Sequence, residues 1–261
     1  SCPGCGSQTS WLTARNLLHC KQCHRQTSVT AGTVFEGTRK PLRVWFQAIW
    51  YLTNQKLGVS ALGLKRVLGL GSYQTAWTWL HKMRLAMVRP GRDMLSGHVE
   101  VDETYRRGEG EGDRGSKTVT KSIVIIAIEV HSPKGFGRIR LRQIPDVTGP
   151  TLIGFIKDVV SAEAIVSPVG WSGYNGSSAL GSQLKRRVQS GSDDPAHVVL
   201  PGPHRIASLL KRWLIGTHQG AVRDEHLDYY LDEYTFRFNR RSAKARGLLF
   251  HRLVEQAVQL N

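Results

Sequence analysis

Apolar residues recur three and four positions apart after Pro41, which predicts an amphipathic helix there. Ser60 offers an N-cap for a second helix over Ala61–Leu68, and Ser72 offers one for a third helix. Glycines break the chain between the last two helices, as they often do at turns. We therefore expect a helical module between residues 38 and 93.

From His98 onward the pattern changes to alternating and continuously apolar runs, which predict strands. The order of three antiparallel strands, a helix, a fourth strand and further helices is that of a ribonuclease-H-like α/β layer. The expected strands are 98–105, 122–130, 138–144 and 164–167. The expected helices begin at Thr148 or Thr151, at Arg205 and at Glu225. A glycine- and charge-rich loop is expected over Arg106–Lys117.

The chain is strongly basic, with 36 Lys and Arg residues against 20 Asp and Glu residues and a formal charge of +16. Residues 1–97 hold 13 basic and 2 acidic residues, and residues 98–261 hold 23 and 18. Because phosphate contacts release counterions, a basic front third favours a polyanionic partner; a solvated basic surface is the alternative. The longest apolar runs, such as Ile123–Ile128, fall far short of the roughly 20 residues of a membrane span, so we expect no membrane partner.

All four cysteines lie within the first 23 residues, as two CxxC pairs separated by 14 residues. Two such knuckles let four thiolates converge tetrahedrally on Zn²⁺, and the spacing is close to that of paired zinc knuckles. The alternatives are two disulfides, which need an oxidising compartment, or a thioredoxin-like pair, which explains one CxxC motif but not two. The chain starts inside this motif without a Met, so we expect a fragment or a trimmed product. The expected zinc ligands are Cys2, Cys5, Cys20 and Cys23, with His24 outside the ligand set.

The last two expected helices of the module and the glycine turn between them resemble a helix-turn-helix, whose second helix contacts DNA. A plain helical connector is the alternative. We expect Trp77 and Trp79 to pack in the core rather than to read bases. The candidate DNA contacts are the polar side chains of Gln74, Thr75, Lys82 and Arg84.

Asp102 is the central acidic position of the first expected strand. In ribonuclease-H-like folds, catalytic carboxylates lie in the middle of the first strand and at the end of the fourth, and a third group comes from a later helix. Carboxylates converge there because two Mg²⁺ ions need oxygen ligands. The end of the fourth expected strand, Ser167–Trp171, contains no carboxylate. Asp102 is therefore a candidate Mg²⁺ ligand, and an ordinary salt-bridge role is the alternative.

Several distinctive motifs occur together in the chain: the two CxxC pairs, Gln26–Thr33, Val101–Thr104, Leu200–His204, Ser208–Trp213, Gly216–Gly220 and Tyr230–Arg241. Their combination is far more specific than any single motif. With these motifs the chain resembles bacterial insertion-sequence transposases of the ISXO type, which carry an N-terminal zinc ribbon before a DDE integrase-type domain. The resemblance extends over essentially all 261 residues.

This resemblance implies metal-dependent DNA cleavage and strand transfer at the ends of an insertion element. Water attacks a phosphodiester, and the freed 3′-hydroxyl then attacks target DNA. Asp102 matches the first catalytic Asp of the family, His204 occupies the place of the third group, and Lys211 matches a Lys seven residues later in many relatives. A neutral imidazole can ligate a metal or relay a proton; a locally hydrogen-bonded His204 and a solvated Lys211 are the alternatives.

Val169 occupies the place of the family's second catalytic Asp. An apolar side chain cannot replace an anionic metal ligand, so this departure predicts a loss of metal affinity and rate. Asp193 and Asp194, in a loop rich in Ser and Gly, are the candidates for a substitute ligand. The leading hypothesis is a DNA transposase whose chemistry Val169 impairs. The alternatives are a catalytically dead DNA-binding protein that recognises element ends and a zinc-ribbon protein that binds RNA or other proteins.

The expected organisation is that of an α/β protein with a zinc ribbon over 1–37, a helix-turn-helix-like DNA-binding module over 38–93, a ribonuclease-H-like transposase domain over 98–246 and a helical tail over 247–261. Among the late basic residues, Arg240 and Arg241 are expected to contact phosphates, or else to form a solvated end. The expected cofactors are structural Zn²⁺ and catalytic Mg²⁺ or Mn²⁺. The expected partner is double-stranded DNA, as terminal repeats and as target. We also expect a homo-oligomer on DNA and a nucleoid-associated location in the bacterial cytoplasm.

Overall fold

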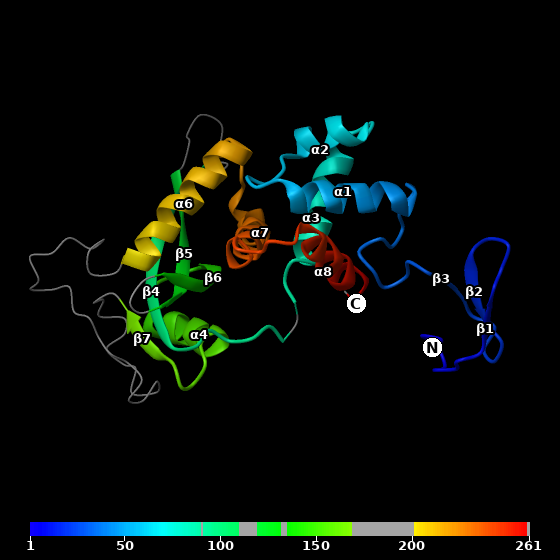
Figure 1. Cartoon of the computed structure of the whole chain (residues 1–261), viewed down its shortest axis with the longest axis horizontal. Coiled ribbons are helices and arrows are strands. Elements are labelled where there is room, and N and C mark those ends of the chain that lie inside the picture. The colour runs from blue at the N-terminus through cyan, green and yellow to red at the C-terminus, as the bar shows by residue number, and fades with distance from the viewer. Residues whose placement is uncertain (90, 110–118, 132–134, 169–200, 260–261) are drawn as a thin grey trace, which may run out of the picture. The chain divides into compact units, whose positions relative to one another are not determined.

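The computed structural model describes residues 1–89, 91–109, 119–131, 135–168 and 201–259, and it divides into two units (Figure 1). Unit 1 consists of Ser1–Lys56, Ala61–Ala86 and Ala245–Asn261, and unit 2 consists of Leu57–Ser60 and Met87–Lys244. Across the described ranges, no helix combines the length and the apolar character that a membrane crossing requires.

Unit 1 begins with a small antiparallel sheet in the order β1-β2-β3. Its strands are β1 (Ser10–Leu12), β2 (Leu17–Cys20) and β3 (Gln26–Ser28). The turn between β1 and β2 is closed by Thr13, whose Oγ1 accepts a hydrogen bond from the Leu17 N–H at 3.1 Å. The short strands leave most side chains exposed, and Cys20 is the buried residue among them.

The rest of unit 1 is helical, and the three helices expected after Pro41 are confirmed. The helices are α1 (Leu42–Asn54), α2 (Ala61–Leu68), α3 (Tyr73–Leu85) and α8 (Arg246–Gln259). Ser72 caps α3 as expected, because its side chain accepts a hydrogen bond from the Gln74 N–H. Trp79 packs in the core, stacked on Trp45 with 3.8 Å between ring centroids.

Unit 2 is built on a four-stranded sheet in the order β6-β5-β4-β7. Its strands are β4 (His98–Glu109), β5 (Val119–Val130), β6 (Phe136–Ile144) and β7 (Ile165–Pro168). The first three pair antiparallel, and β7 runs parallel to β4. All four expected strands are confirmed, but β4 and β5 extend further. The backbone at 106–109 pairs with that at 119–122, so the expected loop over Arg106–Lys117 is partly a β-ladder.

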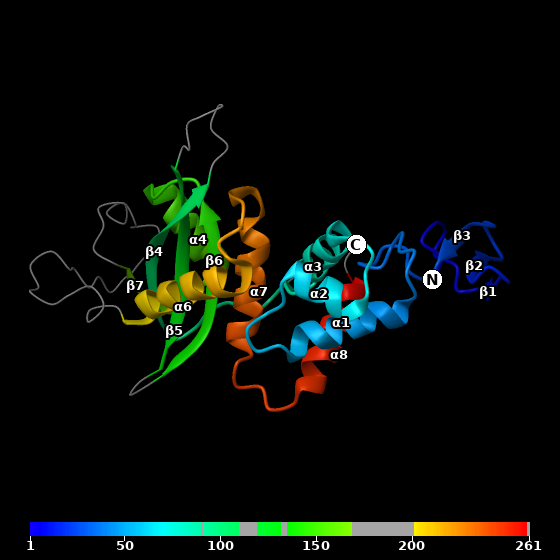
Figure 2. The ribbon, with the colours of Figure 1, turned by 90° about the horizontal axis from the view of Figure 1, so that it is seen from above.

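Helices cover the two faces of this sheet, as Figure 2 shows. The helices are α4 (Gly149–Val159) on one face, and α6 (Pro201–His218) and α7 (Leu227–Asn239), joined through a 3₁₀ turn (Asp224–His226), on the other. Because side chains alternate along a strand, Val99 and Val101 pack with α4, whereas Ile126 and Ile128 pack with α6 and α7. The even-numbered residues of β4, including Asp102, therefore face α6.

α7 also protects the edge of the sheet, which is strand β6. Asn239 accepts a hydrogen bond from the Ile139 N–H at 2.7 Å and donates one to the Ile139 carbonyl at 3.1 Å. The Asp228 carboxylate accepts another from the Gln143 N–H at 2.9 Å. These side chains pair backbone groups that an open edge strand would offer to another chain.

The start of α4 is organised around the carboxylate of Asp146. Thr148 is the N-cap residue but makes no side-chain cap hydrogen bond. Instead Asp146 Oδ1 accepts from the Thr148 N–H and from both the Thr148 and Thr151 hydroxyls. The Thr148 hydroxyl and N–H and the Thr151 hydroxyl lower the pKa of Asp146. The two threonines orient a carboxylate that holds the loop before the helix.

The segment Leu57–Ser60 packs on α6 within unit 2. The Leu57 carbonyl accepts hydrogen bonds from Trp213 Nε1 at 2.9 Å and from the Thr217 hydroxyl at 2.6 Å. The next residue is Gly58, with φ of +88°. A Cβ at that position would lie 3.1 Å from Trp213 Nε1 and 3.4 Å from a carboxylate oxygen of Glu233. Both the backbone conformation and the tight packing therefore require glycine.

We predict that Gly58→Ala lowers the free energy of unfolding of unit 2 by about 2–3 kcal/mol, because it adds a steric clash to left-handed backbone strain. Gly97→Ala is the matched control: its φ is +70°, but a Cβ there would meet nothing within 4 Å. That control should cost only the strain, about 1–2 kcal/mol. Urea unfolding of both variants measures the difference, and equal losses would contradict the proposed packing of Leu57–Ser60 on α6.

Candidate functional site

The four cysteines converge at one point of the small sheet, as expected from the sequence. Their sulfur atoms all lie within 4.8 Å of one another. The Cys2 and Cys23 sulfurs are 3.5 Å apart, and the Cys5 and Cys20 sulfurs are 3.6 Å apart. A tetrahedral Zn²⁺ with bonds of about 2.3 Å requires sulfur–sulfur distances of about 3.8 Å. The spacing thus fits a four-thiolate zinc centre.

The protonation of these thiols shows why a cation suits the cluster. Backbone N–H groups of Cys23 and Gln22 and neighbouring thiols lower the pKa of Cys20 to about 6, despite partial desolvation. For Cys5, a hydrogen bond from the Ser7 backbone lowers the pKa, but burial and the other three thiols outweigh it and raise the value to about 12. Four thiols this close cannot all ionise by themselves, whereas a divalent cation stabilises all four thiolates.

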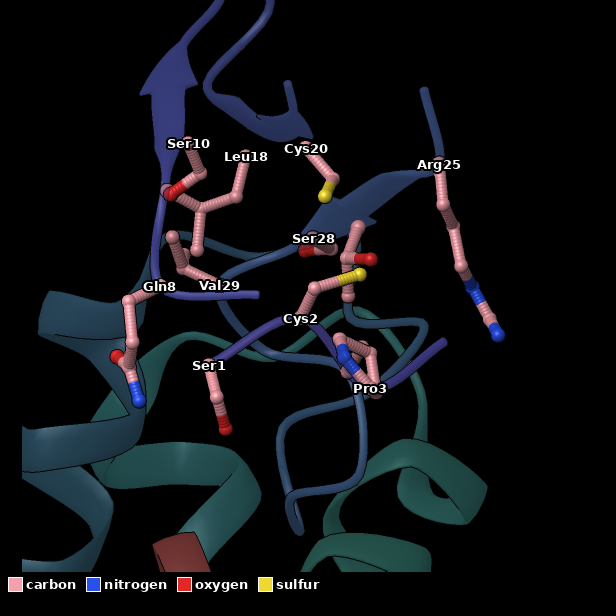
Figure 3. Close-up of a pocket in the computed structure, with 12 residues that line it drawn as sticks. Ser1, Cys2, Pro3, Gln8, Ser10, Leu18, Cys20, Arg25, Ser28 and Val29 are labelled. Atoms are coloured by element: carbon pink, nitrogen blue, oxygen red, sulfur yellow. The ribbon is translucent and has the colours of Figure 1, made fainter. Parts of the chain in front are cut away.

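A hollow of about 290 Å³ adjoins the cysteines (Figure 3). Figure 3 shows the sulfurs of Cys2 and Cys20 beside it, with Leu18 and Val29 among the other lining residues. Leu18 and Val29 are both exposed large apolar residues. The sheet face that carries Cys20 is therefore an open surface with apolar and hydroxyl side chains.

The candidate DNA contacts on α3 fall into two groups. Gln74 is exposed, and Thr75 and Lys82 are half-buried, with the Lys82 ammonium 3.3 Å from the Glu36 carbonyl. Arg84, in contrast, is only 1% exposed. The expectation that Arg84 contacts DNA is wrong, because a buried guanidinium cannot reach a phosphate. Helical spacing places Arg84 beside the core residues Leu80 and Met83.

Asp102 lies in the middle of β4, opposite Ile126 of β5 and facing α6. Its side chain is 13% exposed, and its Oδ1 accepts a hydrogen bond from the Glu103 N–H at 2.9 Å. Burial raises the pKa of Asp102 to about 6, although that backbone hydrogen bond opposes the shift. A carboxylate with so little hydration gains strongly from a nearby cation.

His204 lies next to Asp102 across the α6–sheet interface. Its Nε2 is 3.7 Å from Asp102 Oδ2, and its side chain is 39% exposed. The structure thus brings together two distant residues that the family resemblance placed in one candidate site. Lys211 lies seven residues later, two turns along α6, and is exposed. Helical periodicity places Lys211 on the same side of α6 as His204.

Val169, which is expected to occupy the place of the second catalytic Asp, follows the last residue of β7 and lies outside the described residues. The candidate substitutes Asp193 and Asp194 lie in the same undescribed range. The sheet brings that strand end beside the site: Pro168 pairs with Val101. Glu103 cannot supply the missing ligand, since it alternates with Asp102 and points to the other sheet face. Among the described residues, Asp102 and His204 are not joined by a third acidic, His or Cys ligand.

Two further hydrogen-bonded contacts in this region could not be predicted from the sequence. Glu100 accepts a hydrogen bond from the Gly202 N–H at 3.0 Å. Glu100 lies two residues before Asp102 on β4, and Gly202 lies two residues before His204 on α6. Asp224 accepts hydrogen bonds from Arg106 on β4 and Ser122 on β5. The acidic alternation Glu100, Asp102 was visible in the sequence, but its partner on α6 was not.

The late arginines are partly used inside unit 2. The Arg240 guanidinium lies 4.1 Å from the Phe236 ring centroid, and that of Arg241 lies 4.0 Å from Phe238. Arg241 also donates hydrogen bonds to the carbonyls of Phe136 and Gly137. Burial lowers the pKa of Arg241. These contacts hold the end of α7 on the sheet and leave phosphate contact as a prediction.

We predict that the unmodified protein holds about one zinc ion per chain and that Cys20→Ser loses most of it, because a hydroxyl is a much poorer zinc ligand than a thiolate. His24→Asn is the matched control, since His24 is the exposed neighbour outside the ligand set, with φ of +58° that Asn tolerates. Elemental analysis of the purified variants measures zinc per chain. Zinc loss in His24→Asn, or retention in Cys20→Ser, would contradict the four-cysteine assignment.

The raised pKa of Asp102 predicts a pH-dependent effect of Asp102→Asn on stability. An acid whose pKa is higher in the folded state stabilises the fold fully below its unfolded value, near 4, and this contribution is lost as the pH rises through about 6. In buffer without Mg²⁺ or Mn²⁺, the free energy of unfolding of Asp102→Asn at pH 8 should therefore be about 1–3 kcal/mol higher than that of the unmodified protein. This difference should shrink towards pH 5. The exposed carboxylate of Glu163 provides the control, and Glu163→Gln should show no such trend. An Asp102→Asn variant that is less stable at pH 8 would refute the prediction.

Two comparisons with known proteins bear on the family of this chain. A family model described as an ISXO2-like transposase domain matches residues 94–239, more than half of the chain. A Halobacterium salinarum protein, described as an uncharacterized protein in transposable element ISH50, is 26% identical over 250 residues, which cover 87% of this chain and 82% of that protein. The chain belongs to the family of insertion-sequence transposases with an ISXO2-like transposase domain.

Proposed function

We propose that this protein is a DNA transposase that cleaves and joins DNA at the ends of its insertion element in a divalent-metal-dependent reaction. The observation that carries the proposal is the Asp102–His204 pair, with 3.7 Å between Oδ2 and Nε2, at the middle of the central strand. The sheet order β6-β5-β4-β7, with β4 and β7 parallel and helices on both faces, supports a ribonuclease-H-like domain.

The donor set suits a divalent cation. Asp102 offers a poorly hydrated carboxylate oxygen, the type of ligand that Mg²⁺ prefers, and His204 offers an imidazole nitrogen, which Mn²⁺ accepts more readily than Mg²⁺. When bound, such an ion activates the attacking oxygen and stabilises the leaving oxygen of a phosphodiester. The protein's own part is to hold these donors on a rigid strand and helix.

Lys211 is proposed to contact the DNA backbone beside this site. It is exposed, it lies two turns beyond His204, and a flexible ammonium suits phosphate. Arg240 and Arg241, at the end of α7, are proposed to add phosphate contacts. Sequence-independent contacts of this kind position DNA but do not select a sequence.

Recognition of the element ends is assigned to unit 1. We propose that Gln74, Thr75 and Lys82 on α3 meet double-stranded DNA, and that the segments 1–37 and 38–93 act as a zinc ribbon and a helix-turn-helix-like module. The concentration of positive charge in residues 1–97 supports this assignment. A homo-oligomer on DNA and a nucleoid-associated location follow from the proposed activity.

A second candidate function is DNA binding without catalysis, and the presence of Val169 at the second acidic position favours it. A site with one carboxylate and one imidazole has less negative charge to hold two cations. In that case the protein recognises element ends but does not cut them.

Cleavage and strand transfer on element-end DNA with Mg²⁺ or Mn²⁺ separate the two functions. If Val169 disables the site, Val169→Asp should raise the cleavage rate at least about 100-fold, because it restores an anionic metal ligand. Asp102→Ala in the Val169→Asp background should abolish that activity. Gel-shift titration of the same DNA against random duplex and RNA at matched salt tests the binding assignment.

Each outcome has a distinct meaning. Cleavage by the unmodified protein that Asp102→Ala abolishes would show that another residue supplies the second ligand and that Val169 is not disabling. Specific binding without cleavage by the unmodified protein would favour the second function, whether or not Val169→Asp restores cleavage. Cleavage that persists in Asp102→Ala would refute the proposed site.

A further inference from the structure

Two polar contacts join β4 to the start of α6. Glu100 and Asp102 are two residues apart on β4 and therefore share the face that meets α6. Gly202 and His204 are two residues apart at the start of α6. The Glu100 carboxylate accepts a hydrogen bond from the Gly202 N–H at 3.0 Å, and His204 Nε2 lies 3.7 Å from Asp102.

The environment of Glu100 explains why this hydrogen bond matters. The residue is 2% exposed, and a buried carboxylate without partners would be strongly destabilising. The first N–H groups of a helix have no partner inside the helix, and the helix dipole favours a negative charge near them. The carboxylate and the start of α6 thus satisfy each other.

Gly202 makes the close approach possible. A Cβ at this position would lie 2.7 Å from Glu100 Oε2, 2.9 Å from Ile128 Cγ2 and 3.3 Å from Phe136 Cε1. Two of these distances are shorter than real Cβ contacts, so a side chain at this position would force the first turn of α6 or the neighbouring side chains, Glu100 among them, to shift. A shift of the helix turn would move His204, which lies about half a turn further along the helix.

We propose that Glu100 is a positioning residue that, together with Gly202, fixes the first turn of α6 on β4 so that the His204 imidazole stays beside Asp102. The proposal rests on the proposed function in treating Asp102 and His204 as the reactive pair. It deepens that function, because it assigns the geometry of the pair to a buried acid outside the pair.

The test uses the full chain and two readouts. The first is Mn²⁺ affinity, measured by electron paramagnetic resonance. The second needs no metal: it is the shift of the His204 ring resonance caused by Asp102→Asn, which reports contact between the two side chains. We expect Glu100→Ala and Gly202→Ala to weaken Mn²⁺ binding by about tenfold or more, as loss of an outer partner of a ligand commonly does. Both should also abolish the response of His204 to Asp102→Asn.

Glu100→Gln keeps an acceptor oxygen for the Gly202 N–H and should preserve both readouts. If Glu100→Ala does not fold, Glu100→Asp shortens the reach by one methylene and should give the same losses. Glu129→Ala is the stability control. Glu129 is also a buried carboxylate that accepts backbone N–H groups, from Ser96 and Arg138, but it alternates with Ile128 and faces away from α6.

Gly216→Ala is the control for the helix, because a Cβ there would meet nothing within 4 Å. Neither control should change either readout. Equal effects of Glu129→Ala and Glu100→Ala, or an unchanged His204 response in Glu100→Ala, would overturn the proposal. If Asp102→Ala leaves Mn²⁺ affinity unchanged, the proposed metal site fails, while the metal-free readout still decides whether Glu100 positions His204.

Discussion

The burial of carboxylates in the middle of a central strand is the constraint on which unit 2 depends. β4 pairs on both sides and carries Glu100, Asp102 and Glu103 within four residues. Each buried carboxylate needs a donor or a cation, because the interior solvates charge poorly. Glu100 meets a backbone N–H of α6, and Asp102 meets the Glu103 N–H with His204 nearby. The start of α6 is therefore held on the sheet by a hydrogen bond to Glu100 as well as by apolar packing.

The same face shows how apolar and polar layers cooperate. Ile126, opposite Asp102, packs with Ile206, Leu210 and Leu214 of α6. This contact holds the body of the helix, while the hydrogen bond between Gly202 and Glu100 holds its end. Two attachments along one helix fix both its distance from the sheet and its rotation. A side chain such as His204, placed next to the second attachment, gains a defined position from both.

Much of the fold was predictable, because local patterns determine it. The alternation around Asp102 and the spacing of Trp45 and Leu52 each correspond to an element of the structure. Failures arose where a partner far away in sequence decides the outcome. The ladder at 106–109 depends on backbone pairing with 119–122, and polar residues can make these backbone hydrogen bonds as well as apolar ones. Arg84 looked exposed because charged residues usually are, whereas helical position places it in the core.

The site was predictable only in part, for a related reason. Cysteine spacing is a local pattern, so the four-cysteine cluster could be read from the chain. The Asp102–His204 pair came from resemblance to a family, since no pattern links a strand to a helix about 100 residues later. The hydrogen bond between Glu100 and Gly202 had neither signal. A glycine in the first turn of a helix does not by itself indicate a close contact, and the 2.7 Å approach to Glu100 becomes visible only in three dimensions.

Architecture and catalytic competence are separable in this protein. Burial raises the pKa of Asp102 to about 6, so its ionised form weakens the fold at neutral pH in the absence of a cation. The fold therefore does not depend on that negative charge. The family match and the sheet order describe the fold, but a fold does not by itself imply activity. Activity has to be argued from the side chains that could bind a metal ion, such as Asp102 and His204. If Val169 occupies the place of the second acid, as the resemblance implies, the protein keeps the geometry of Asp102 and His204 and lacks the charge needed to bind a second cation.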